Sequence, residues 1–292
     1  MGRVGPRMGD EDPPVAASST ALPVLHITAD GPPLAASWSF FWSRRDAVIV
    51  LARRLLGARY QQTLLGVGWA FLHPLLAIGV FTWLLSSWST ARAPESSWLA
   101  HNTSGWVPWG FFAATLTSSA ASLSQHASLL RDVALPRLAL PLASLAARCV
   151  DLAIALVVLI ALLALDGTVP AASAWLFPLP LAGLALLGLG IGLALASFQM
   201  RWRDVGQVLP YLLQLGLFAT PVVVPAAVLE DAWPPLRFLN PAWGHIAAAR
   251  STLLGLPLDG AAWISSWAWT AAALGGGLFV FARSQRRLAE WA

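Results

Sequence analysis

Long apolar stretches separated by short polar connections dominate this chain. The first follows an arginine cluster that ends at Arg59, and the sequence from Tyr60 to Ala91 carries no formal charge. A helix needs roughly 20 apolar residues to cross a bilayer. The hydropathy pattern predicts six spans, at residues 66–88, 105–125, 138–165, 174–198, 205–229 and 261–282. We therefore expect an all-α membrane protein with six transmembrane helices.

The segments around these spans predict smaller elements. Residues 1–37 are rich in Pro, Gly, Ala and Ser, which is typical of a disordered tail. Residues 38–62 combine an aromatic start with a polar arc and an apolar arc, which favours a helix in the membrane interface, although an amphipathic helix packed on protein fits equally well. The six-span domain then occupies residues 63–292. Between spans five and six, residues 230–260 predict short re-entrant helices at the outer surface.

Prolines and glycines refine two of the spans. Pro210, Pro221 and Pro225 each remove a backbone donor, so the fifth span should be kinked or broken towards its outer end. In the fourth span, Gly188 and Gly192 have the GxxxG spacing that lets two helix backbones approach closely.

The positions of the basic residues predict the orientation. All 18 are arginines. If both termini are cytoplasmic, fourteen lie in inside segments, Arg148 lies within a span, and only Arg92, Arg237 and Arg250 lie in outside loops. Cytoplasmic loops are enriched in basic residues, so this orientation is the expected one.

Composition excludes several classes of chemistry. Without a lysine the chain has no P-loop for ATP hydrolysis and no amine for a Schiff base. The arginines beside the spans account for the basic charge through contacts with membrane lipids, so we expect no nucleic-acid partner. Cys149 is the only cysteine and the histidines are scattered, so neither a disulfide within the chain nor a metal site is expected. The chain itself should need no cofactor.

Two features could carry function or only structure. Arg148 and Asp151 are three residues apart in the third span, hence on one helix face. They could form a polar contact in a translocation path or a coupling relay, or, in the interpretation we favour, a mutually neutralised pair that positions helices. Aromatic side chains such as Trp69, Phe71, Phe81 and Trp83 could stack on sugar rings or anchor the helix ends in the interface.

Four motifs then resemble, in order, the membrane subunits of type-2 ABC exporters of polysaccharides. Arg59, Tyr60, Thr63, Leu65, Gly66, Trp69 and Pro74 resemble RYxxTxLGxxWxxxxP; Pro136, Arg137, Leu140, Pro141 and Asp151 resemble FPRxxLPL followed by VDxxIAL. Arg203, Asp204, Pro210, Gln214, Phe218, Pro221, Val222 and Pro225 resemble YRDVxxxxPxxLQxxxFxxPVxxP; Leu239, Asn240, Pro241 and Arg250 resemble LNPxxxxIxxxR. The glutamate usual before the last arginine is replaced by Ala247 or Ala248.

The resemblance implies a homodimer bound to two separate subunits that bind ATP and Mg. It implies a coupling helix that contacts those subunits at Leu129, Leu130, Arg131, Asp132, Val133, Pro136 and Arg137. It also implies a conduit between the two copies, for which we expect the lining residues Trp69, Phe71, Phe81, Trp83, Tyr211, Gln214 and Phe218. The substrate headgroup should be steered by Arg44, Arg45, Arg53, Arg54, Arg59 and Tyr60.

The expected cargo is a lipid-linked polysaccharide, such as an O-antigen or a capsule, crossing the bacterial cytoplasmic membrane. The same architecture could export teichoic acid, a small lipid or a drug. A polytopic transferase is a further alternative, but it needs converging Asp, Glu or His side chains at the membrane surface, and the sequence places few carboxylates there.

Overall fold

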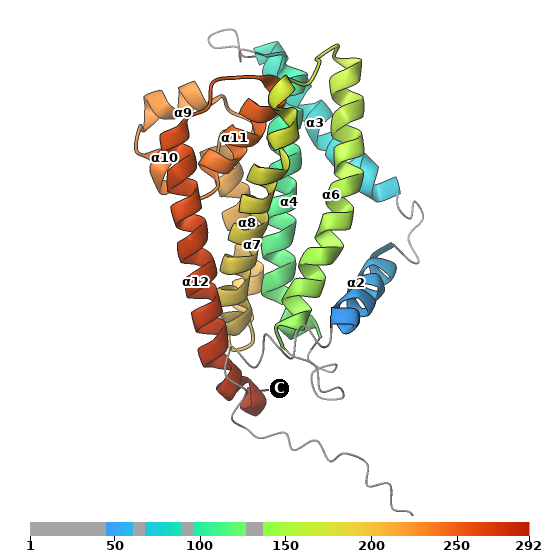
Figure 1. The fold of residues 1–292 in the computed structure, drawn as a ribbon, viewed down its shortest axis with the longest axis vertical. Helices are drawn as coiled ribbons and strands as arrows, with labels where there is room; N and C mark the ends of the chain where they lie inside the picture. Colours follow the sequence, from blue (N-terminus) through green and yellow to red (C-terminus); the bar gives the residue numbers. More distant parts are fainter. Residues whose placement is uncertain (1–44, 61–67, 89–95, 127–136, 292) are drawn as a thin grey trace, which may run out of the picture.

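The computed structural model describes residues 45–60, 68–88, 96–126 and 137–291, and this part of the chain is helical, with no strand. The predicted tail, residues 1–37, lies outside the described residues. The elements are α2 (Arg45–Tyr60), α3 (Gly68–Trp88), α4 (Trp98–Gln125), α6 (Ala139–Leu165), the 3₁₀ helix η1 (Ala172–Leu176), α7 (Pro178–Gln199), α8 (Asp204–Ala219), α9 (Ala226–Ala232), α10 (Leu236–Leu239), α11 (Trp243–Leu254) and α12 (Gly260–Trp291) (Figure 1).

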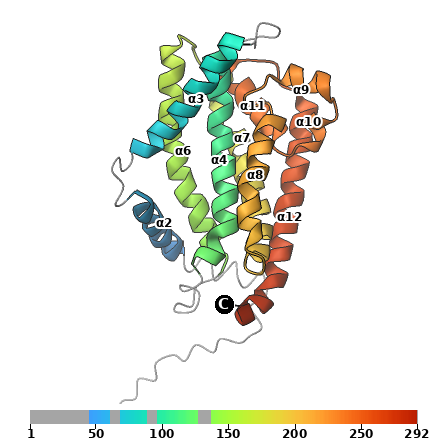
Figure 2. The ribbon, with the colours of Figure 1, turned by 180° about the vertical axis from the view of Figure 1, so that it is seen from behind.

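The long helices form a bundle around α4 and α7. Helix α7 packs between α4 and α12, and α6 packs along another side of α4. Helices α3 and α8 also contact α4, and Figure 2 shows them on either side of it. The short helices α9, α10 and α11 lie together at one end of the bundle, called the upper end here after Figure 1, and α2 lies near the lower end.

Close backbone contact holds α7 to α4. A Cβ atom added to Gly188 would lie 3.2 Å from the carbonyl oxygen of Phe112, and one added to Gly192 would lie 2.5 Å from the Cβ of Ser119. Helix association in a bilayer depends on such close packing, because lipid tails remove the usual hydrophobic driving force. The predicted approach at Gly188 and Gly192 is therefore confirmed.

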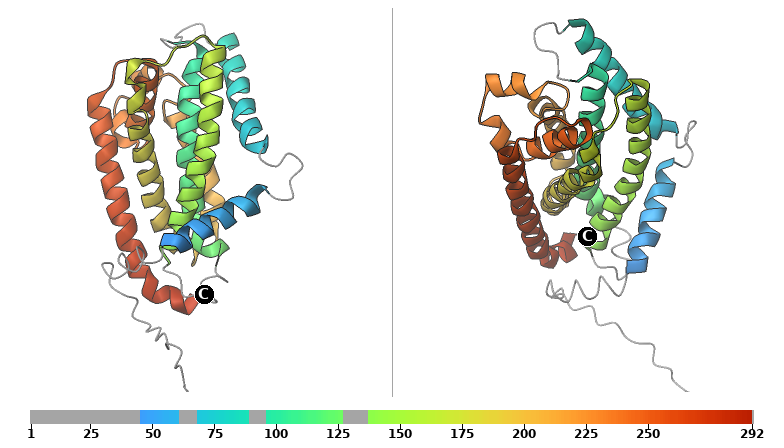
Figure 3. Two further views of the ribbon diagram at one scale, coloured as in Figure 1. Left: turned by 45° about the vertical axis from the view of Figure 1, so that its right-hand side comes forward. Right: turned by 45° about the horizontal axis from the view of Figure 1, so that its top comes forward.

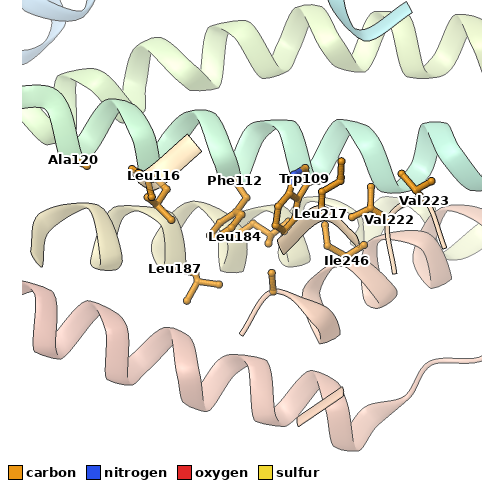
Figure 4. Packing of buried hydrophobic residues seen from close by; sticks show 12 residues of the cluster. Trp109, Phe112, Leu116, Ala120, Leu184, Leu187, Leu217, Val222, Val223 and Ile246 are labelled. Carbon is orange, nitrogen blue, oxygen red and sulfur yellow. The ribbon is translucent and has the colours of Figure 1, made fainter. Parts of the chain in front are cut away.

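The middle of α4 is the centre of a buried apolar cluster. Side chains of α4, α7, α8, α11 and the segment after α8 meet there: Trp109, Phe112, Leu116, Leu184, Leu187, Leu217, Val222 and Ile246 (Figure 4). Helices α7 and α11 and the upper end of α8 are thus packed against one another and against α4.

Within the described part of the chain, three helices are long and apolar enough to cross a membrane: Ala139–Leu165, Ala172–Gln199 and Gly260–Ser284. The other three predicted spans coincide with α3, α4 and α8, which do not meet this criterion of length and apolarity. Helix α3 has a shorter apolar stretch, Pro74–Ser87, and α8 has 16 residues. Helix α4 begins at Trp98 instead of Gly105, because the hydroxyl of Ser97 accepts a hydrogen bond from the Ala100 amide and caps the helix.

The expected fifth span is not one continuous helix. Helix α8 ends at Ala219, and α9 begins at Ala226 after a turn. The predicted break is thus confirmed, and it falls between Thr220 and Pro225. The short helices expected between spans five and six are also present, as α9, α10 and α11.

Helix α2 packs against α6 along one edge only. Val48, Leu51, Ala52 and Leu55 join a buried cluster with residues of α6, whereas Ile49, Val50 and the polar Arg53 and Arg54 are exposed. Figure 3 shows α2 lying across the lower part of α6. The predicted amphipathic helix exists, and part of its apolar surface is covered by protein while another part is not.

Candidate functional site

The broken end of α8 is held by side chains from distant parts of the chain. A helix leaves its last carbonyl groups without intrahelical donors. At this end the Thr220 hydroxyl donates to the Gly216 carbonyl oxygen at 2.7 Å. The side-chain amide of Asn240 donates to the Ala219 carbonyl oxygen and to the Thr220 hydroxyl, both at 2.8 Å. Asn240 in turn accepts a hydrogen bond from the Ala242 amide at 3.0 Å.

Arg250, on α11, completes this arrangement from inside the protein. Its side chain is 5% exposed. One terminal nitrogen donates to the Val222 carbonyl oxygen at 3.0 Å and to the His101 carbonyl oxygen at 3.2 Å, and Nε donates to the Ser104 hydroxyl at 3.3 Å. Arg250 therefore ties the segment after α8 to the first turns of α4.

The space around Arg250 admits no further side chain. A Cβ atom on Gly105 would lie 2.6 Å from a terminal nitrogen of Arg250 and 2.7 Å from the Val222 carbonyl oxygen. The three acceptors recorded for Arg250 in the described part of the chain are all uncharged. A buried cation is costly unless its donors are satisfied, so the position of Arg250 depends on these three hydrogen bonds. We call Thr220, Asn240 and Arg250 the α8 cap.

The face of α8 below this cap is largely exposed. Only Leu209 and Leu217 are buried, and both point to the α4 and α7 side. Tyr211 is 69% exposed, and Gln214 and Phe218 are exposed as well. All three were predicted to line a conduit, and the structure places them on the uncovered part of α8.

The predicted conduit residues of α3 are also mostly uncovered. Trp69, Phe71 and Trp83 are exposed, whereas Phe81 is partly buried. The ring of Phe81 lies 5.2 Å from that of Trp106 and 6.4 Å from that of Phe218, measured between centroids. The structure thus brings Phe81 and Phe218 together, while the other predicted lining residues are exposed on their own helices.

The predicted headgroup residues are only partly described. Arg53 and Arg54 are exposed on α2. Arg44 lies outside the described residues, as do the side chains of Arg45, Arg59 and Tyr60. Of the predicted coupling residues, Leu129, Leu130, Arg131, Asp132, Val133 and Pro136 lie outside the described residues. Arg137 is partly buried at the lower end, where its carbonyl oxygen accepts from the Leu140 amide.

The predicted pair on α6 is an ion pair. Nη1 of Arg148 lies 3.1 Å from Oδ2 of Asp151, and the side chains are 19% and 20% exposed. Pairing of this kind is expected for charges on an apolar helix. The geometry agrees with mutual neutralisation of the two charges. A role of this pair in transport stays a prediction.

The α8 cap is the feature that sequence reasoning missed. Asn240 and Arg250 both belong to the fourth motif, and Pro221, Val222 and Pro225 belong to the third. In the structure, Asn240 and Arg250 of the fourth motif donate hydrogen bonds to the Ala219 and Val222 carbonyl groups, at the helix break within the third motif. An arginine spaced ten residues from an asparagine in a region otherwise poor in charge was the available signal.

Comparisons with known proteins agree with the motifs. The family described as "ABC-2 type transporter" matches residues 46–254. The chain is 28% identical over 187 residues to the "O-antigen export system permease protein RfbA" of Myxococcus xanthus, which covers 64% of this chain and 71% of that protein. A protein of the same name from Klebsiella pneumoniae is 22% identical over 215 residues, covering 73% of this chain and 82% of that protein.

Proposed function

The chain belongs to the ABC-2 type transporter family and is a membrane-embedded permease subunit of an ABC exporter, and from this premise we propose that its cargo is a lipid-linked polysaccharide. The observation that carries the proposal is that the relatives named as O-antigen export permeases match over most of their own lengths. The aromatic side chains exposed on α3 and α8 support it, because aromatic rings offer apolar faces on which sugar rings can stack.

The proposed topology has six spans: α3, α4, α6, η1 with α7, α8, and α12. Residues 1–37 form a cytoplasmic tail, residues 38–62 an interface helix, and residues 63–292 the permease domain. The lower end faces the cytoplasm of a bacterial inner membrane, and α9–α11 re-enter the outer leaflet. Arginines support this orientation: Arg53, Arg54, Arg137, Arg201, Arg203 and Arg283 belong to the lower end, against Arg237 and Arg250 at the upper end.

Two copies of the chain pair with two ATP-binding subunits in the proposed assembly. The family implies an ABC partner, and a chain without lysine has no P-loop of its own. ATP and Mg therefore bind to the partner, and residues 129–137 form the contact that transmits its movement. Replacing Arg131 and Arg137 with glutamate should reduce copurification of the ATP-binding subunit. Unchanged association would remove this assignment, and Arg237→Glu at the opposite end is the matched control.

The proposed path follows the uncovered faces of α3 and α8 where the two copies meet. The exposed Arg53 and Arg54 on α2, with Arg44, Arg45, Arg59 and Tyr60, would attract the phosphate groups of the lipid carrier at the cytoplasmic surface. The exposed rings of Trp69, Trp83, Tyr211 and Phe218 would then contact the sugar chain.

Deletion of the gene in its host tests the cargo. Lipid-linked glycan should accumulate on the inner leaflet while the surface polysaccharide disappears, and the intact gene supplied in trans should restore it. A normal surface polymer in the deletion strain would contradict the proposal. Loss of a teichoic acid, or greater sensitivity to a drug, would then assign the alternative cargo.

A further inference from the structure

We propose that Arg250 and Asn240 are positioning residues for transport, because the α8 cap fixes the rotation of α8 about its own axis. This inference rests on the proposed function, in which the uncovered face of α8 lines the path. Rotation decides which side chains face that path, since residues on a helix are spaced about 100° apart. A helix held in the wrong rotation would turn Tyr211 and Phe218 away from the cargo.

Packing buries only a narrow strip of the surface of α8. Leu209 and Leu217 are its only buried residues, and Leu213 is partly buried beside them. Gly216 continues this face, because a Cβ atom there would lie 3.0 Å from the ring of Trp109. Apolar contacts of this kind have no directional preference. This narrow strip therefore restricts the rotation of α8 at few points, of which Gly216 is the tightest.

The cap supplies directional contacts. The Ala219 carbonyl group projects from the last turn of α8, and the Val222 carbonyl group lies in the segment that directly follows the helix; each accepts a hydrogen bond from a side chain on a separate segment. Hydrogen bonds weaken steeply when donor and acceptor are misaligned. Turning α8 would break these bonds and leave the buried guanidinium of Arg250 with fewer acceptors, which is costly in an apolar environment.

The groups that hold the cap are themselves rigidly placed. Arg250 lies on α11, which packs on α4, α7 and α12, and its other acceptors belong to the first turns of α4. The adjoining Gly244 amide donates to Ser266 of α12 at 2.8 Å. The cap thus links the end of α8 to α11 and to the first turns of α4.

Spin labels provide the test. Single cysteines are placed at each position from 207 to 218 of the full-length chain except Gly216, in a Cys149→Ala background and in complex with its ATP-binding subunit in nanodiscs. Oxygen accessibility of the nitroxide should oscillate with the helical period and reach its minima at Leu209 and Leu217. In Arg250→Met the minima should shift or the oscillation should be lost, and surface polysaccharide should fall while the complex still assembles.

Two further variants keep the test decisive. Asn240→Ala removes the bonds to Ala219 and Thr220 and leaves the three Arg250 hydrogen bonds in place, so it serves if Arg250→Met fails to assemble. Ser251→Ala is the matched control, because the neighbouring Ser251 hydroxyl bonds to the Leu256 carbonyl oxygen and not to α8. Unchanged minima in the cap variants would overturn the inference, as would shifted minima with full export. Failure of the proposed function would appear differently, as absence of polysaccharide export by the unmodified chain.

Discussion

Helices α7 and α8 follow one another in the chain and are both strongly apolar, yet they are placed in opposite ways. Helix α7 is buried along most of its length, with glycines against α4 and α12. Helix α8 buries only Leu209 and Leu217 and exposes its large side chains. Of the two, only α7, together with η1, is long and apolar enough to cross a membrane, and side-chain size distinguishes the helix that packs from the helix that presents a surface.

The largest effect should come from filling the α7 contact. Gly192→Leu adds a side chain where even a Cβ atom would lie 2.5 Å from Ser119. Overpacking typically costs about 1–3 kcal/mol, and more where backbone must move, so the variant should fail to accumulate in the membrane. Immunoblotting of membrane fractions measures this. Ala182→Leu, at an exposed position of the same helix, should accumulate normally; equal levels of both variants would mean that α7 is not the tightly packed element.

An intermediate effect is expected on the exposed face of α8. The double change Tyr211→Ala and Gln214→Ala should leave protein level and complex assembly intact, because both side chains are exposed. Export should fall about fivefold, which corresponds to loss of roughly 1 kcal/mol of aromatic contact with the cargo. Surface polysaccharide per cell is the measurement. Ile264→Ala, similarly exposed on α12, is the control, and equal export by the two variants would remove α8 from the path.

The smallest effect should come from the ion pair on α6. Asp151→Ala removes the (i, i+3) ion pair with Arg148 and should destabilise the complex by roughly 0.5 kcal/mol. Replacing both residues with leucine should be nearly neutral, since apolar pairs often substitute for ion pairs without loss. Thermal unfolding of the purified complex tests both statements. A stable double variant that no longer exports would favour the coupling-relay interpretation instead.

Local chemistry made part of this structure predictable. Pro221 and Pro225 cannot continue a helix, so the end of α8 could be placed from sequence, and Gly188 with Gly192 marked the contact with α4. The orientation of Arg148 and Asp151 followed from helical periodicity alone. Each of these predictions uses residues that lie close together in the chain.

The α8 cap depends on contacts that local pattern cannot supply. Arg250 is 149 residues from His101 and 28 from Val222, and nothing in the intervening sequence indicates which carbonyl groups it meets. The start of α4 was likewise misplaced, because its polar first turns, with His101 and Ser104, resemble a loop until Arg250 is seen to need them. Buried polar groups that hydrogen-bond to one another are not marked by apolar residues in the sequence, so the hydropathy pattern does not reveal that they are buried.

The central claim is that the exposed face of α8 contacts a lipid-linked polysaccharide, and photocrosslinking tests it most directly. A photoreactive phenylalanine analogue is introduced at Tyr211, and in a separate strain at the buried Leu187 of α7, with the ATP-binding subunit present. Irradiation of cells should give polysaccharide-bearing adducts of the chain at position 211 and none at position 187. Absence of adducts at 211, or equal yields at the two positions, would contradict the account.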